Sequence, residues 1–133
     1  DDERARMLVI QPVHGFADHG LGLPLDAEEV LGSAVLETAL NLPGAPLVRV
    51  LPPLRFGLAP YPSTFFGVDP ETAHAQAREI ALGVRAAGFH RLVFFNTSPW
   101  NEEWVDATSR DLRADLSLQT FFVHLGALGC DFH

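Results

Sequence analysis

The chain has 133 residues and a formal net charge of −8, with 47% hydrophobic and 20% charged residues. A chain of this length is expected to form one domain, residues 1–133, that buries about 68% of its unfolded surface. Its nine cationic residues are scattered arginines, which excludes a basic nucleic-acid surface. No apolar run reaches the roughly 18 residues of a membrane span, the charged start is not a signal peptide, and the single cysteine favours a cytoplasmic location.

The first half of the chain alternates between short apolar runs and a helical pattern. Residues 7–10 predict a strand buried on both faces, which Pro12 ends. A helix is predicted from 28 to about 40, and a second strand over 47–51. The apolar residues expected on one face of this helix are Val30, Leu31, Ala34, Val35 and Ala39.

A long loop without periodicity follows, over residues 52–68. Loops of this length are either functional or part of an interface. Its aromatic side chains either cover the core of the domain or form a site wall or subunit contact. These residues are Phe56, Tyr61, Phe65 and Phe66.

The second half of the chain contains two more helices and two more strands. Residues 69–71, Asp-Pro-Glu, are a strong helix start, and Gly88 is typical of the position just after a helix end. Strands are predicted over 91–95 and 117–124, and a third helix from 102 to about 114, with Asn101 as its cap. The predicted buried residues of the two helices are Ala73, Ala77, Ile80, Ala81, Val84, Trp104, Val105, Thr108 and Leu112.

This order of elements predicts an α/β fold, with a mostly parallel four-stranded sheet in a three-layer α/β/α arrangement. Ligands of such sheets bind beyond the carboxyl ends of the strands. The loops at 12–28, 52–68 and 96–101 all leave predicted carboxyl ends, so they locate the candidate site.

Two segments carry a resemblance to a known family. Residues 12–28 read PVHGFADHGLGLPLDAE and resemble the metal loop of the creatininase family, PVGSTEQHGPHLPLxTD. Residues 88–96, GFHRLVFFN, resemble that family's GFxRIVxVN strand and lead into NTSPWN (96–101), where the family has NGHGGN or NGHYEN. The resemblance covers nearly the whole chain, and the order and spacing of the matches are its most specific feature.

The resemblance implies an α/β/α fold and a metal-dependent hydrolase of cyclic or linear amides, often hexameric, with two divalent ions. The family's metal-binding positions fall on Ala17, His19, Glu28, Ser98 and Trp100 of this chain, and the second histidine of the family's loop falls on Gly22. Of these, only His19 matches the family's residue unchanged, and Glu28 replaces an aspartate. Ala17 and Trp100 offer no ligand atom, and a serine hydroxyl is a poor neutral ligand for a hydrolytic metal site.

Two functions of different class remain open. The first is a noncatalytic binding or structural subunit that has lost most of its dinuclear metal site and forms a homo-oligomer or a hetero-oligomer with a related subunit. The second is a metal-dependent amidohydrolase that acts on amide or cyclic amide C–N bonds through a rebuilt site. Its cofactor would be Zn, Mn or Fe, whereas the first function needs none; either can take a small-molecule amide as ligand.

The acidic and histidine residues of the 12–28 loop are the candidates for a rebuilt site. The candidate metal ligands are His19, Glu28 and Asp26, and the candidate lining residues are His14, Asp18, Ser98 and Trp100. The structural alternative is that Asp18 and Asp26 are solvated, His14 caps the strand end and His19 bonds the loop backbone. Likewise, Ser98 is either a nucleophile or a turn residue, and His124 either faces the site or packs within the sheet.

Overall fold

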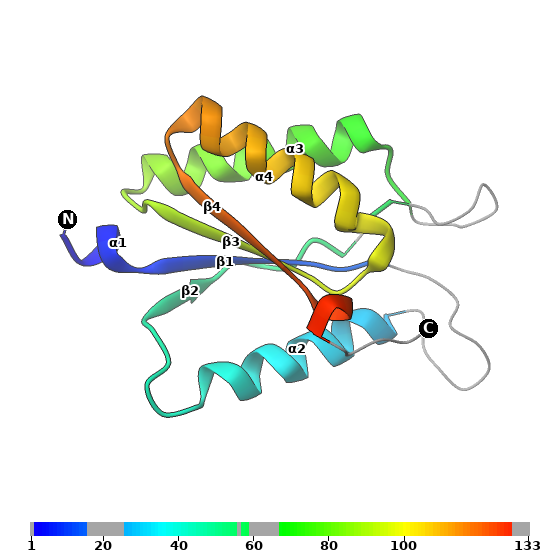
Figure 1. Ribbon diagram of the computed structural model, residues 1–133, viewed down its shortest axis with the longest axis horizontal. Coiled ribbons are helices and arrows are strands. Elements are labelled where there is room, and N and C mark those ends of the chain that lie inside the picture. Colours follow the sequence, from blue (N-terminus) through cyan, green and yellow to red (C-terminus); the bar gives the residue numbers. More distant parts are fainter. Residues whose placement is uncertain (1, 16–25, 56, 59–66, 129–133) are drawn as a thin grey trace.

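The computed structural model describes residues 2–15, 26–55, 57–58 and 67–128 (Figure 1). The first half of the chain contains α1 (Asp2–Arg6), β1 (Leu8–Val13), α2 (Ala27–Leu40) and β2 (Val48–Val50). The second half contains α3 (Pro70–Ala86), β3 (Arg91–Asn96), the 3-10 turn η1 (Pro99–Asn101), α4 (Glu102–Leu116), β4 (Gln119–His124) and η2 (Leu125–Leu128).

The strands form one four-stranded parallel sheet in the order β2-β1-β3-β4. Helices α3 and α4 cover one face of the sheet and α2 covers the other (Figure 1), so the predicted α/β/α arrangement is confirmed. Val13 pairs with Asn96, and Asn96 pairs with His124. The carboxyl ends of β1, β3 and β4 therefore lie side by side, and the segments that follow them meet at one edge of the sheet.

Strand β1 continues through Pro12 to Val13, so the prediction that Pro12 ends it is wrong. The Pro12 carbonyl oxygen accepts a hydrogen bond from Leu54 N at 3.0 Å, which places the Pro12 backbone on the β2 side of the strand. Strand β2 has already ended at Val50. The proline therefore lacks its N–H at a point where the neighbouring strand no longer requires a ladder hydrogen bond.

The larger core lies between the sheet and the pair α3 and α4. The helix residues predicted to be buried there are fully buried or pack against this core. Small alanines at 73, 77 and 81 let α3 approach the sheet closely, while Val9, Leu92 and Phe94 fill the space from the strands. The periodicity of both helices therefore predicted the buried faces correctly.

Helix α2 buries only part of the predicted face: Leu31 and Val35 are confirmed, and Val30, Ala34 and Ala39 are not. Leu31, Val35, Leu36 and Leu40 pack against the smaller core formed by Ile10, Phe95 and Leu125. Val30 is 57% exposed, and Ala34 and Ala39 are exposed too. The predicted stripe mixed two faces because α2 is apolar around most of its circumference, so that spacing alone did not identify the buried side.

The helix ends follow local sequence signals. Thr72 N donates to Asp69 Oδ1 at 2.9 Å, which confirms Asp69 as the cap of α3 and lowers the pKa of its carboxyl. Gly88 has a φ of +95°, which suits a glycine after the helix end. The short α1 was not predicted; its Arg4 donates to the Ala87 carbonyl oxygen at 2.7 Å. Within the described ranges, no helix combines the length and apolarity needed to cross a bilayer.

Replacing Leu112 by alanine should lower the free energy of unfolding by about 3 kcal/mol, because it removes a fully buried side chain from the larger core. Urea denaturation measures this loss. Leu82→Ala is the matched control: Leu82 is 37% exposed on α3, and its truncation should cost less than about 1 kcal/mol. Equal losses for the two variants would contradict this assignment of the core.

Candidate functional site

The buried side-chain amide of Asn101 connects three segments at the carboxyl end of the sheet. Its Nδ2 donates to the His14 carbonyl oxygen at 3.0 Å. Its Oδ1 accepts from Leu58 N and from Trp104 Nε1, both at 2.9 Å. Asn101 does occupy the predicted cap position before α4, but its side chain makes no capping hydrogen bond to a backbone N–H of the helix. Asn101 instead joins the end of β1, the segment after β2 and helix α4.

Gly57 allows this arrangement. A Cβ atom at residue 57 would overlap the Asn101 side-chain amide. Any other residue at this position would push the Asn101 amide away from Leu58 N, which donates a hydrogen bond to it and belongs to the residue directly after Gly57. A glycine is therefore required where the chain passes Asn101.

A second buried pair links β1 to β3. The His14 ring nitrogen Nδ1 lies 2.7 Å from Thr97 Oγ1, and the Thr97 hydroxyl in turn lies 3.4 Å from the Val13 carbonyl oxygen. Because that hydroxyl donates to the carbonyl, it accepts the His14 Nδ1–H. Helix α2 passes over the pair at Gly32, where a Cβ atom would collide with the Thr97 methyl group and come within 2.9 Å of His14 Cε1.

The environment of His14 keeps its imidazole neutral. Burial lowers the pKa of His14 from its ordinary 6.5 to about 4, because charging the ring in the interior is costly. Glu29 partly opposes this shift and Arg55 adds to it, and these two side chains form an ion pair with an N–O distance of 2.5 Å. His14 is therefore a neutral hydrogen-bonding group at neutral pH.

Ser98 and Glu28 lie next to the backbone of Gly15. A Cβ atom built on Gly15 would lie 3.4 Å from Ser98 Oγ and 3.7 Å from Glu28 Oε1. Ser98 is 2% exposed and Glu28 is fully buried. The first turn of α2 and the turn after β3 thus bring a carboxylate and a hydroxyl together at the start of the 12–28 loop.

The turn at Ser98 is held by the side chain of Asn96. Ser98 N donates to Asn96 Oδ1 at 3.0 Å, and Asn96 Nδ2 donates to the Ser98 carbonyl oxygen at 2.8 Å. Asn96 Nδ2 also lies 3.0 Å from His124 Nδ1, and His124 Nε2 lies 2.6 Å from Asp106 Oδ1. His124 therefore packs at the end of the sheet with both ring nitrogens engaged, and the backbone of Ser98 is extended, with a φ of −104° and a ψ of 125°, just before η1 begins.

The remaining predicted site residues are partly described. Asp26 precedes α2, half-buried and without a side-chain bond to the helix start. Trp100 is half-buried within η1. Asp18 and His19 lie outside the described residues, as do the four aromatic residues predicted for the 52–68 loop. The structure therefore brings Glu28 and Ser98 together and places His14 against Thr97.

Sequence reasoning placed Asn96 and Thr97 in the candidate loop 96–101 but assigned neither of them a role, and it missed Asp106 altogether. The available signal was the run of small polar residues at 96–98, directly after a buried strand, where the backbone turns and needs internal hydrogen-bond partners. No comparable signal marks Asp106, which lies within α4 and meets His124 only through the fold.

Comparisons with known proteins give one consistent result. A family model described as Creatininase: Creatinine amidohydrolase matches residues 1–130. Among solved structures, a Bacteroides fragilis protein assigned to the creatinine amidohydrolases superposes with a TM-score of 0.73 at 21% identity, covering 91% of this chain and 50% of that one. No curated protein matches the chain.

Two creatininase structures superpose similarly. One, described as creatininase with Mn, has a TM-score of 0.71 at 20% identity and covers 95% of this chain and 55% of that one. A mutant creatininase of Zn-Zn type has a TM-score of 0.71 at 21% identity, with 98% and 57% covered. The chain thus spans about half the length of the solved structures it matches.

The contact of Gly32 with the His14–Thr97 pair predicts that Gly32→Ala destabilises the fold by about 2 kcal/mol, because the added methyl group overpacks a buried contact. Gly83→Ala on α3 is the matched control, since nothing lies within 4 Å of a Cβ there, and it should stabilise by up to about 1 kcal/mol. Adding Thr97→Ser to Gly32→Ala should restore part of the loss in urea denaturation. A neutral Gly32→Ala would contradict the close approach.

The lowered pKa of His14 makes stability depend on pH. The His14 ring takes up a proton near pH 6.5 in the unfolded chain and near pH 4 in the folded chain. Protonation therefore favours the unfolded chain, so the stability that the neutral ring allows is fully present above pH 6.5 and is lost as the pH falls towards 4. Between pH 7.5 and 5.0 the free energy of unfolding should fall by about 2 kcal/mol from this group. Urea denaturation at both pH values should show a smaller fall for His14→Gln and an unchanged fall for His90→Gln, at an exposed position. The same fall in both variants would rule out His14 as its source.

Proposed function

The chain belongs to the creatininase family, since the family model matches residues 1–130, and we propose that it serves there as a noncatalytic binding or structural subunit. The resemblance of segments 12–28 and 96–101 to the family's metal loops supports this proposal. At three of the positions where the family has its ligands, this chain carries Ala17, Ser98 and Trp100. Such a change removes imidazole and carboxylate donors and leaves the supporting fold intact.

The hydrogen bonds at the carboxyl end of the sheet support the proposal further, and they are the observation that carries it. The side chains of Asn101, His14 and Asn96 bond to partners within the protein. Each of these interactions joins two or more segments of the fold. A region organised in this way stabilises the loop framework, whereas a hydrolytic centre has to direct polar groups towards a substrate.

The described donors do not fit a dinuclear metal centre. Over residues 2–15, 26–55, 57–58 and 67–128, no three His, Cys, Asp or Glu side chains are grouped so that they could share an ion. Glu28 and Ser98 contribute one carboxylate and one hydroxyl beside Gly15, whereas Zn and Mn sites of hydrolases use several anionic or imidazole ligands. We therefore derive no reaction step through a metal.

The alternative function is a metal-dependent amidohydrolase acting on amide or cyclic amide C–N bonds. The burial of Glu28 favours it, because the resemblance places this residue on a metal-ligand position and a carboxylate is rarely buried in full. A rebuilt site of this kind would use Glu28 with Asp26, His19 and His14, and would hold Zn, Mn or Fe.

We also propose that the chain acts as one domain in the cytoplasm and assembles into a homo-oligomer or with a related subunit. Apolar side chains on the outer strand β4 support the assembly. Phe121 and Phe122 are 45% and 40% exposed. Exposed aromatic and aliphatic groups on sheet edges are typical of surfaces that another chain covers.

Elemental analysis of protein purified without a metal-affinity tag tests the proposed function. A noncatalytic subunit should contain only substoichiometric Zn, Mn or Fe, and Glu28→Gln should leave that content unchanged. One or more ions per chain, lost on Glu28→Gln but retained in the exposed control Glu79→Gln, would instead establish the alternative.

A further inference from the structure

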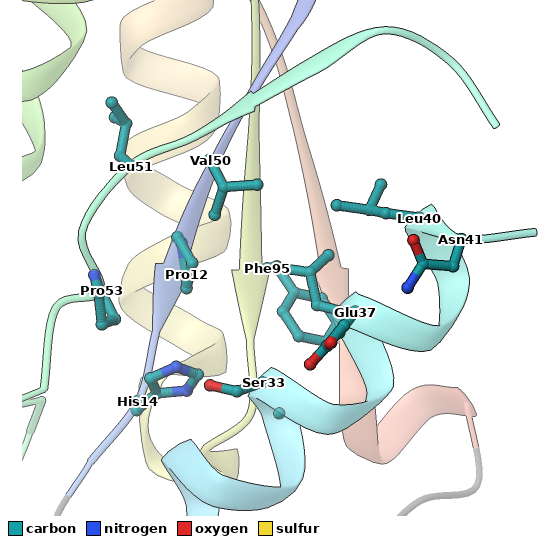
Figure 2. Close-up of a pocket in the computed structure, with 12 residues that line it drawn as sticks. Pro12, His14, Ser33, Glu37, Leu40, Asn41, Val50, Leu51, Pro53 and Phe95 are labelled. Atoms are coloured by element: carbon teal, nitrogen blue, oxygen red, sulfur yellow. The ribbon is translucent and has the colours of Figure 1, made fainter.

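A cavity of about 400 Å³ lies between α2 and the β2 side of the sheet (Figure 2). Its walls come from the end of β1, the segment around the end of β2, Phe95 of β3 and one side of α2. The volume falls within the range of small-molecule sites in proteins. All its lining residues belong to the described part of the chain.

The cavity exists because the sheet is short on this side. Strand β2 has only three residues, and after Leu51 the chain turns away through two prolines. Helix α2 continues past this point, and Gly32 contributes no side chain to fill the space. The cavity therefore results from the course of the backbone: a short β2, the turn at the two prolines and the longer α2.

The lining combines an apolar surface with a few polar groups. Pro12, Leu36, Leu40, Val50, Leu51, Pro53 and Phe95 form the apolar part. Figure 2 shows the Ser33 hydroxyl turned towards His14 at one end of the cavity, and Glu37 near Phe95 with Asn41 beyond it. Burial keeps His14 neutral at neutral pH, and Glu37 is the only other acidic or basic residue in the lining.

This arrangement identifies the kind of ligand that fits. A carboxylate beside an apolar wall attracts a cation and repels an anion. The ring of Phe95 and the side chain of Leu36 offer a surface for a flat apolar body. A carboxylate and a side-chain amide oxygen, from Glu37 and Asn41, can both accept hydrogen bonds from an amidinium or ammonium group.

We propose that this cavity binds a small organic cation, with its apolar body against Phe95 and its amidinium or ammonium group on Glu37. The inference deepens the proposed function, because it gives a noncatalytic binding subunit a ligand site and a ligand class. The site is formed by α2 and the β2 side of the sheet and does not depend on any metal.

Three probes of the same shape test the charge preference. Benzamidine is a cation, benzamide is a neutral amide and benzoate is an anion. Titrations followed by NMR should show benzamidine binding about fivefold more tightly than benzamide, as expected for one partly exposed charge pair, and benzoate binding most weakly. The shifted signals should include Ser33, Leu36 and Phe95, and added salt should weaken benzamidine binding.

Variants at the cavity test its location. Glu37→Gln should reduce benzamidine affinity about fivefold, to the level of benzamide, while Glu79→Gln on α3 should leave it unchanged. Val50→Trp should abolish binding of all three probes, because position 50 is exposed at the cavity and tolerates a large side chain without disturbing the core. Amide spectra of each variant establish that it is folded.

The proposal is overturned if benzamidine binds no better than benzamide or benzoate, or if Glu37→Gln and Val50→Trp both bind it like the unchanged protein. These outcomes differ from failure of the proposed function. Stoichiometric metal in tag-free protein would refute the noncatalytic role and leave the titrations as they are, whereas loss of charge preference would refute the ligand site alone.

Discussion

The carboxyl end of the sheet depends on one buried side-chain amide. Asn101 bonds to the end of β1, to Leu58 and to Trp104, which lie in segments far apart in the sequence. A buried polar group that loses its partner costs about 1–3 kcal/mol, so these segments hold their relative positions together. Asn101 is also the last residue of η1, the turn that contains Trp100 and directly follows Ser98.

The interior beside Asn101 contains a buried imidazole, that of His14. The family's metal loop has glycine at the position of His14, and this chain accommodates the larger ring through two features. Gly32 leaves room for it beneath α2, and Thr97 provides a hydrogen bond to the neutral ring. Because both features are buried, the added side chain contributes to packing between β1, β3 and α2. This part of the candidate site thus contributes to the architecture.

The fold followed from sequence patterns because they report local rules. Alternation of strand and helix patterns predicted a parallel sheet, and Asp69 with Pro70 predicted the start of α3. The errors arose where neighbours in space decide the outcome. Pro12 is tolerated because β2 is short, and Val30 is exposed because only one side of an evenly apolar helix meets the sheet. Asn101 has the sequence context of a helix cap, and only the fold brings Leu58, 43 residues away in sequence, to its oxygen. Trp100, Glu28 and Ser98 were located at the correct end of the sheet, although their roles stay predictions.

The central position of β1 has a consequence for biosynthesis. Its partner strand β3 begins at Arg91, which pairs with Leu8 across most of the chain. Strand β1 must therefore wait for a partner that is synthesised much later, with only the three residues of β2 to pair with in the interval. Nascent chains of this protein expose an apolar strand throughout that delay, which makes early association with a chaperone valuable for its yield.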